Sequence, residues 1–158
     1  MGTLYLMCGL PFSGKTVLAE ALVQHLDGAY LSLDEINIER GLFGGAEIPV
    51  GEWERTHQIA LGRLDALMQQ GVDVVLDDTN NLRMLRDRFR NMAIEHAYST
   101  RLLYLAPPPE VMRTRTRQGA GNRTLTVFEA PQPDESPLLL DKVRNPQEQA
   151  AEIVNESA

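Results

Sequence analysis

The stretch that decides the fold lies near the start of the chain and reads Gly9-Leu10-Pro11-Phe12-Ser13-Gly14-Lys15-Thr16. It fits the P-loop pattern in full, with a first glycine followed after four residues by Gly-Lys-Thr. Glycine lets the backbone turn tightly, so that consecutive N–H groups can point at phosphate oxygens. A helix that begins near Lys15 adds the positive end of its dipole. The pattern therefore predicts a site for the phosphates of a nucleotide.

The end of this loop carries two side chains with expected contacts to the nucleotide. Lys15 reaches the β- and γ-phosphates, and the Thr16 hydroxyl ligates Mg²⁺. Cys8, directly before the loop, is expected to be a buried strand residue rather than a nucleophile. The residues expected to bind ATP are Gly9, Leu10, Pro11, Phe12, Ser13, Gly14, Lys15, Thr16 and Val17.

Short apolar runs alternate with segments of helical periodicity along the whole chain. Strands are expected at residues 3–8, 29–33, 72–76, 101–106 and 137–140, and helices at 15–26, 34–40, 52–70, 82–96, 109–117 and 146–154. Such alternation predicts a parallel sheet with helices on both faces. We expect an α/β, three-layer P-loop NTPase fold of the nucleoside-kinase-like type, with a five-stranded parallel sheet in the order 2-3-1-4-5 and a short lid.

Length and composition fit one globular domain. The chain has 158 residues, of which 43% are hydrophobic, and residues 1–158 are expected to form a single P-loop kinase-like domain. Residues 118–137 are the least regular stretch and are expected to form a flexible lid or loop. No apolar run approaches the roughly 20 residues of a membrane span, and the N-terminus does not resemble a signal peptide. Cys8 alone cannot form an internal disulfide or a cysteine-based zinc site, and a cytoplasmic location is expected.

The charge of the chain disfavours a long polyanion as partner. The net charge is −7, whereas non-specific binding to nucleic acid depends on neutralising many phosphates. A local positive cluster nevertheless occurs at Arg113, Arg115, Arg117 and Arg123. A small anionic ligand therefore fits better than a nucleic acid, and no membrane partner is expected.

Carboxylates follow two of the expected strands. Asp34 ends the second strand, and Asp77-Asp78 end the third. Because ligands bind beyond the carboxyl ends of parallel strands, these side chains should face the phosphates. We assign Asp34 as the general base that accepts the proton of an attacking hydroxyl, and Asp78 to the Mg²⁺ side or to the substrate. The alternative for Asp34 is a helix N-cap, a position that aspartate favours.

These motifs together resemble a known group of kinases. Besides the P-loop, the runs Ser32-Leu33-Asp34-Glu35 and Val75-Leu76-Asp77-Asp78-Thr79-Asn80 are similar to P-loop kinases related to the polynucleotide 5′-kinase domain, the zeta toxins and chloramphenicol phosphotransferase. The resemblance covers about residues 3 to 135. In that group a strand ends in Asp-Thr-Asn, which favours Asp78 over Asp77 as the functional carboxylate. The resemblance implies substrate contacts from Asp34, Asn37, Arg40, Asp78 and Asn80.

One position departs from the polynucleotide kinases. They carry an arginine three residues after the catalytic aspartate, where it holds the phosphate of the substrate, and this chain has Asn37 there. Arg40, one turn further along, could take its place. The departure weakens the case for a nucleic-acid 5′ end as substrate.

The expected helix at 109–117 carries two arginines on one face. Arg113 and Arg117 are four residues apart, as in the kinases that the chain resembles. Arginines that close over a transferring phosphoryl group stabilise its charge, and Gly119 and Gly121 suit a lid that opens. A solvated basic face is the alternative. The expected catalytic residues are thus Lys15, Asp34, Arg113 and Arg117, with Arg113 also contacting ATP.

Three functions follow from this site, and the first is favoured. The chain is expected to be an ATP- and Mg²⁺-dependent kinase acting on a hydroxyl of a small molecule or nucleotide. The alternatives are a polynucleotide 5′-hydroxyl kinase and a regulatory ATPase without an acceptor. Surface or core roles are expected for His25, His57 and His96. The acceptor and the oligomeric state stay open.

Overall fold

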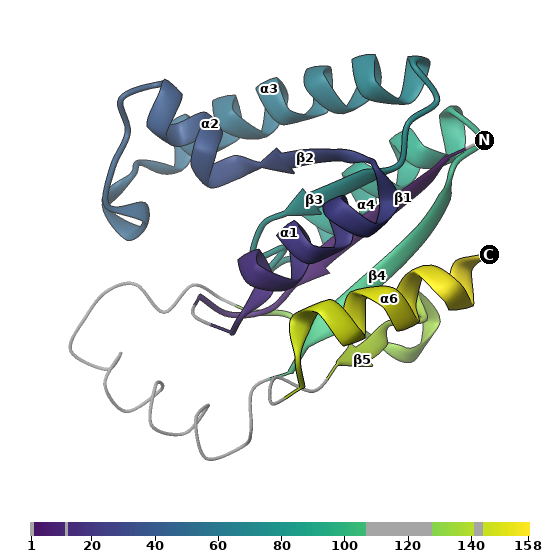
Figure 1. Cartoon of the computed structure of the whole chain (residues 1–158). Helices are drawn as coiled ribbons and strands as arrows, with labels where there is room; N and C mark the ends of the chain where they lie inside the picture. Colours follow the sequence, from purple (N-terminus) through teal and green to yellow (C-terminus); the bar gives the residue numbers. More distant parts are fainter. Residues whose placement is uncertain (1, 12, 107–127, 141–143) are drawn as a thin grey trace.

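The sheet has the predicted composition and strand order. The computed structural model describes residues 2–11, 13–106, 128–140 and 144–158 (Figure 1). Its strands pair in parallel in the order β2-β3-β1-β4-β5, which confirms the prediction. The strands are β1 (Thr3–Cys8), β2 (Ala29–Ser32), β3 (Val74–Asp77), β4 (Ser99–Leu105) and β5 (Leu138–Leu140).

Helices cover both faces of this sheet, so the fold has three layers (Figure 1). The described helices are α1 (Lys15–Leu26), α2 (Leu33–Glu39), α3 (Val50–Gln69), α4 (Arg83–Glu95) and α6 (Pro146–Ser157), with short 3₁₀ turns η1 (Gly45–Glu47) and η2 (Pro133–Glu135). Helices α1 and α6 lie side by side on one face, and α3 and α4 lie on the other. Among these helices, none has both the length and the apolar character to cross a bilayer.

Strand β1 shows why the sheet is buried on both sides. Successive side chains of a strand point to opposite faces. Leu4 and Leu6 belong to the core cluster under α3 and α4, whereas Tyr5 and Met7 belong to the cluster under α1 and α6. Both sets are at most 1% exposed. A strand that is apolar at every position is therefore the central strand of a sheet covered on both faces.

Two boundaries at the carboxyl edge of the sheet differ from the sequence prediction. Strand β2 ends at Ser32, and α2 begins at Leu33, because the Ser32 hydroxyl accepts the backbone N–H of Glu35 at 3.3 Å and caps the helix. Strand β3 extends to Asp77, beyond the predicted end at 76. The predicted helix at 109–117 lies outside the described residues.

Candidate active site

The P-loop joins β1 to α1 at the carboxyl edge of the sheet. Gly14 has a φ of 94°, a left-handed conformation that favours glycine. A Cβ on Gly9 would lie 2.9 Å from the carbonyl oxygen of Leu105, so no larger residue fits there without a shift of β4. The Gly9 N–H donates to the carbonyl of Thr79 at 3.2 Å, which holds the loop against the end of β3. Both glycines are thus required by the backbone path.

Lys15 is held inside this loop. Its Nζ donates to the carbonyl of Leu10 at 3.0 Å, and the residue is only 8% exposed. Burial lowers the pKa of Lys15, while Asp77, Asp78 and Asp34 oppose that shift by favouring the charged form. The lysine therefore lies within the field of all three carboxylates that the sequence singled out.

Asp77 is the carboxylate that contacts the P-loop. The Thr16 hydroxyl donates to Asp77 Oδ2 at 2.8 Å, and the Tyr30 hydroxyl donates to the same oxygen at 2.7 Å. Burial and the hydrogen bond to Asp77 raise the pKa of Tyr30, so its hydroxyl stays a donor. The resemblance had pointed to Asp78 for this place.

Asp78 directly follows β3, and its contacts differ from those of Asp77. The alternation along β3 assigns Val75 to the cluster under α1 and Leu76 to the cluster under α3, so Asp77 continues the α1 side and Asp78 the α3 side. Asp78 Oδ2 accepts the backbone N–H of Asn80 at 3.2 Å. Burial raises the pKa of Asp78, and the His57 imidazole opposes the shift.

Asp34 lies in the first turn of α2 and is exposed. The helix cap is Ser32, so the alternative that Asp34 serves as the N-cap is wrong. Partial desolvation and the neighbouring Asp77 raise the pKa of Asp34, whereas Lys15 lowers it. The side chain is therefore placed near the lysine and available to a substrate.

Arg40, Asn37 and Asn80 make structural contacts. Arg40 pairs with the Glu52 carboxylate and donates to the Thr56 hydroxyl at 2.9 Å, so it is bound to α3 rather than directed at a substrate phosphate. The Thr56 hydroxyl donates to Asn37 Oδ1 at 2.5 Å. Asn80 is buried with a φ of 47°, and its amide donates to the carbonyl of Met7 at 2.7 Å.

The remaining residues that the sequence singled out are either buried, exposed or outside the described residues. Cys8 is fully buried, as predicted, and burial raises the pKa of its thiol to about 12. Val17 is 56% exposed on the first turn of α1. Phe12, Arg113, Arg117 and residues 118–127 of the predicted lid lie outside the described residues.

A buried ion pair that was not predicted from the sequence lies beside the site. Arg86 on α4 is 0% exposed, and its Nε donates to Glu135 Oε1 at 2.8 Å. Its Nη1 donates to the carbonyls of Asn80 at 2.8 Å and Glu129 at 2.9 Å. This arginine therefore ties the end of β3 to the segment before β5.

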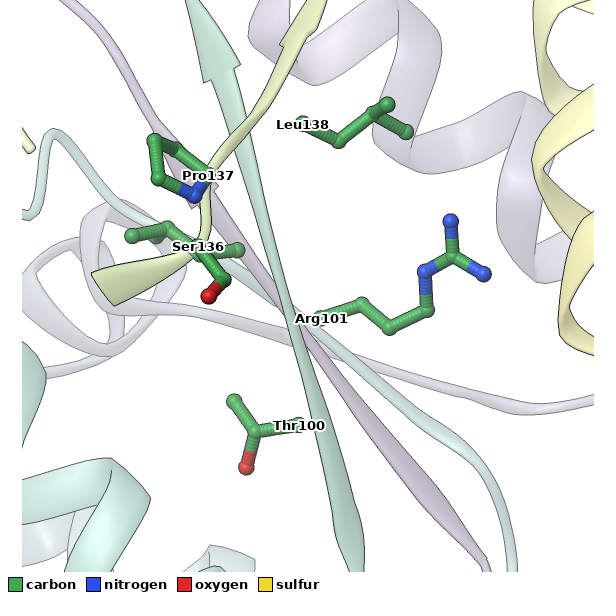
Figure 2. A pocket seen from close by; sticks show the side chains of 6 residues that line it. Thr100, Arg101, Ser136, Pro137 and Leu138 are labelled. Carbon is green, nitrogen blue, oxygen red and sulfur yellow. The ribbon is translucent and has the colours of Figure 1, made fainter. Parts of the chain in front are cut away.

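A surface hollow lies at the other edge of the sheet. It has a volume of about 300 Å³ and is lined by Thr100, Arg101, Leu102, Ser136, Pro137 and Leu138 (Figure 2). These residues lie near the amino ends of β4 and β5, opposite the P-loop edge. Figure 2 shows that Arg101 points to the other side of β4 from Thr100 and Ser136, so the polar groups do not converge. The hollow is not part of the candidate site.

Solved structures share this fold at low sequence identity. The APS kinase CysC of Mycobacterium tuberculosis, in complex with AMPPNP and APS, has a TM-score of 0.72 at 19% identity, over 98% of this chain and 96% of that chain. A gluconokinase from Sinorhizobium meliloti 1021 has a TM-score of 0.64 at 18% identity, over 99% of this chain and 89% of that chain. A chain of a Pnkp1/Rnl/Hen1 complex has a TM-score of 0.62 at 17% identity, over 83% of this chain and 42% of that chain.

The family follows from a match to the sequence itself. No curated protein is similar enough to count as a match. A family model described as an AAA domain matches residues 4–132, which is most of the chain and includes the P-loop, Asp34 and the Asp77-Asp78 pair. The chain therefore belongs to this AAA domain family and has the fold of the P-loop kinases.

Proposed function

We propose that the protein is an ATP- and Mg²⁺-dependent kinase that transfers the γ-phosphate to a hydroxyl of a small molecule or nucleotide. The proposal rests on one observation: side chains of the P-loop lie close to carboxylates at or just beyond the ends of β2 and β3, at the carboxyl edge of the sheet. Thr16 contacts Asp77 directly, and Lys15 lies in the field of Asp34. The kinases among the similar structures support phosphoryl transfer over a regulatory switch.

The Thr16–Asp77 pair suits a magnesium ion. Both groups offer hard oxygen ligands, and they lie 2.8 Å apart at the start of α1. Mg²⁺ binds through one or two such groups and retains several waters and phosphate oxygens. Bound Mg²⁺ would neutralise charge on the β- and γ-phosphates. We therefore propose Asp77, in place of Asp78, as the partner of Thr16 on the metal side.

Asp34 is proposed to accept the proton of the attacking hydroxyl. Its carboxylate is exposed at the start of α2 and interacts with Lys15, so an acceptor placed between them would face the γ-phosphate. Arg113 and Arg117 belong to the predicted helix at 109–117, directly before the predicted lid at 118–137. We propose that they stabilise the charge of the transferring phosphoryl group. A single domain and a cytoplasmic location stay predictions from the sequence.

The test is an Asp34→Asn variant in an ADP-release assay with nucleosides, oligonucleotides, antibiotics and sugars as acceptors. We expect acceptor-dependent ADP release to fall by about 10²-fold or more, because a positioned general base contributes that much. Affinity for Mg·ATP should change little, as measured by calorimetry. Full transfer activity in the variant would remove Asp34 from the mechanism.

The same assay separates the alternatives. ADP release that never depends on an added acceptor would favour a regulatory ATPase. A strict requirement for oligonucleotide 5′ ends would favour a polynucleotide kinase, as one similar structure comes from a Pnkp1 complex. The binding of Arg40 to Glu52 counts against this second alternative, because the substituting cation is already paired.

A further inference from the structure

His57 is a buried polar residue on the acceptor side of the site. It lies on α3, is 5% exposed, and its ring centroid is 5.8 Å from that of Phe89 on α4. Its Nδ1 has no hydrogen-bond partner among the described residues. The sequence predicted a surface or core role. The structure confirms that His57 is buried. Packing in the core does not explain why its Nδ1 has no hydrogen-bond partner among the described residues.

Asn37 presents a second unpaired group, and its orientation is fixed by a relay. The Arg40 guanidinium can only donate, so the Thr56 hydroxyl accepts from it and turns its own hydrogen toward Asn37. Asn37 must therefore offer Oδ1 to Thr56 and direct Nδ2 elsewhere. Nδ2 is buried and has no partner in the part of the chain that the structure describes.

The fold brings these two groups toward the carboxylates. Asp34 and Asn37 are three residues apart on α2 and share one face of that helix. His57 follows Thr56, the residue that contacts Asn37. Burial lowers the pKa of His57, and the Asp78 carboxylate after β3 opposes that shift. Strand pairing places Ser32, the last residue of β2, opposite Asp77, the last residue of β3, so Asp34 lies two residues and Asp78 one residue beyond the ends of adjacent strands. We call Asp34, Asn37, His57 and Asp78 the acceptor corner.

The chemistry of this corner matches hydroxyl groups. Buried polar atoms in proteins nearly always have a partner, and leaving one unpaired is costly. The corner offers an amide donor, an imidazole nitrogen and carboxylate acceptors. A hydroxyl both donates and accepts, so a molecule with several hydroxyls can pair with all of them.

The charges of the corner disfavour an anionic acceptor. Among the described residues, every arginine from Arg40 to Arg90 is in an ion pair with an aspartate or glutamate. Arg88, whose charge helps to lower the pKa of His57, donates from Nη1 to both carboxylate oxygens of Glu54 at 3.0 Å. The corner thus holds two carboxylates and no uncompensated arginine from α2, α3 or α4 in the described chain. The cation that acts on both carboxylates is Lys15, which is assigned to the phosphates of ATP.

We infer that Asn37 and His57 bind the acceptor, and that the acceptor is a hydroxyl-rich molecule without a negative charge, such as a sugar, an amino sugar or a nucleoside. This inference rests on the proposed kinase function and names the substrate class of the same site. His57 would bind an acceptor hydroxyl through Nδ1 and position it near Asp34, and Asn37 would donate through Nδ2.

The first test compares matched acceptors with the full chain and Mg·ATP. Each pair shares one hydroxyl scaffold with and without a phosphate: a hexose and its phosphate, and a nucleoside and its 3′-phosphate, with an amino sugar as a cationic case. The phosphate-free members should have a kcat/KM at least about tenfold higher, because a phosphate would face the like charges of Asp34 and Asp78.

The second test changes His57. In His57→Phe, the KM for the acceptor should rise by about tenfold or more, while the KM for ATP stays within about twofold. His57→Asn keeps a polar atom near the position of Nδ1 and should recover most of the loss. His25→Phe, at an exposed position on α1, is the matched control and should leave both constants unchanged. An ATP-induced rise in melting temperature shows that each variant is folded.

The outcomes separate the inference from the function on which it rests. If no compound of either kind stimulates ADP release, the kinase function fails and the inference falls with it. If transfer occurs but a phosphorylated acceptor is preferred, the inference alone is overturned. The inference is also overturned if a folded His57→Phe protein keeps the acceptor KM of the original chain, or if His57→Asn recovers none of the loss.

Discussion

At the scale of single residues, the positions of the P-loop and of Asp34 at the carboxyl edge of the sheet were predictable, whereas the sequence could not decide which of Asp77 and Asp78 contacts the P-loop. The P-loop follows from a fixed spacing, and Asp34 follows from its place after a strand. Asp77 is the last residue of β3 and Asp78 follows it directly, so only the direction of the side chain separates them. Because this strand is buried on both faces, Val75 and Leu76 are equally apolar and carry no information about which face meets α1.

Matched variants of these two aspartates decide their roles. In Asp77→Asn, the Mg²⁺ concentration for half-maximal activity should rise by about tenfold or more, since the carboxylate paired with Thr16 loses its charge. In Asp78→Asn, this concentration should stay unchanged, whereas the KM for the acceptor should rise. Magnesium titration of ADP release measures both effects. The reverse pattern would restore Asp78 to the metal side, as the family resemblance first suggested.

At the scale of helices and strands, the sequence predicted all the described strands and their order, but missed contacts between distant segments. Hydrophobic periodicity reports which face of an element is buried, and it does not report polar partners. Four arginines between residues 83 and 90 suggest a solvated face on α4, yet Arg86 is fully buried. Its partner Glu135 is 49 residues away, beyond the reach of any local pattern.

The Arg86–Glu135 pair should make stability depend on pH. Burial raises the pKa of Glu135, but hydrogen bonds from Arg86 and Gln132 outweigh it, so the net pKa lies below the ordinary 4.5. The pair therefore stabilises the fold above that pH, and the contribution is lost as the pH falls below 4.5 through the lowered pKa. Glu135→Gln should cost about 3–5 kcal/mol at neutral pH, because it leaves the buried charge of Arg86 without a counter-charge.

Urea unfolding at several pH values measures this effect. The free energy of unfolding of Glu135→Gln should vary less below pH 4.5 than that of the original chain. Asp134→Asn, which removes an exposed partner of Arg83, is the control and should change stability little. Equal acid sensitivity of the Glu135→Gln and original proteins would show that other carboxylates govern acid unfolding.

At the scale of the whole molecule, nucleotide binding should stabilise the fold as a unit. The P-loop is bonded to the end of β3 through Gly9–Thr79 and Thr16–Asp77, and Arg86 links that end to Glu129 and Glu135. A ligand at 100 times its Kd adds about 2.7 kcal/mol to the free energy of unfolding. For a chain of this length, Mg·ATP should therefore raise the melting temperature by about 5–10 °C.

Differential scanning calorimetry with and without Mg·ATP tests this prediction, with Lys15→Met as the control. The variant keeps a long side chain in the buried position but loses the charge that meets the phosphates, so most of the thermal shift should disappear. Asp34→Asn should keep the full shift, because Asp34 is proposed to act on the acceptor and not on ATP. A shift of the same size in Lys15→Met would mean that the nucleotide binds away from the P-loop, and the placement of every other site residue would then have to be reconsidered.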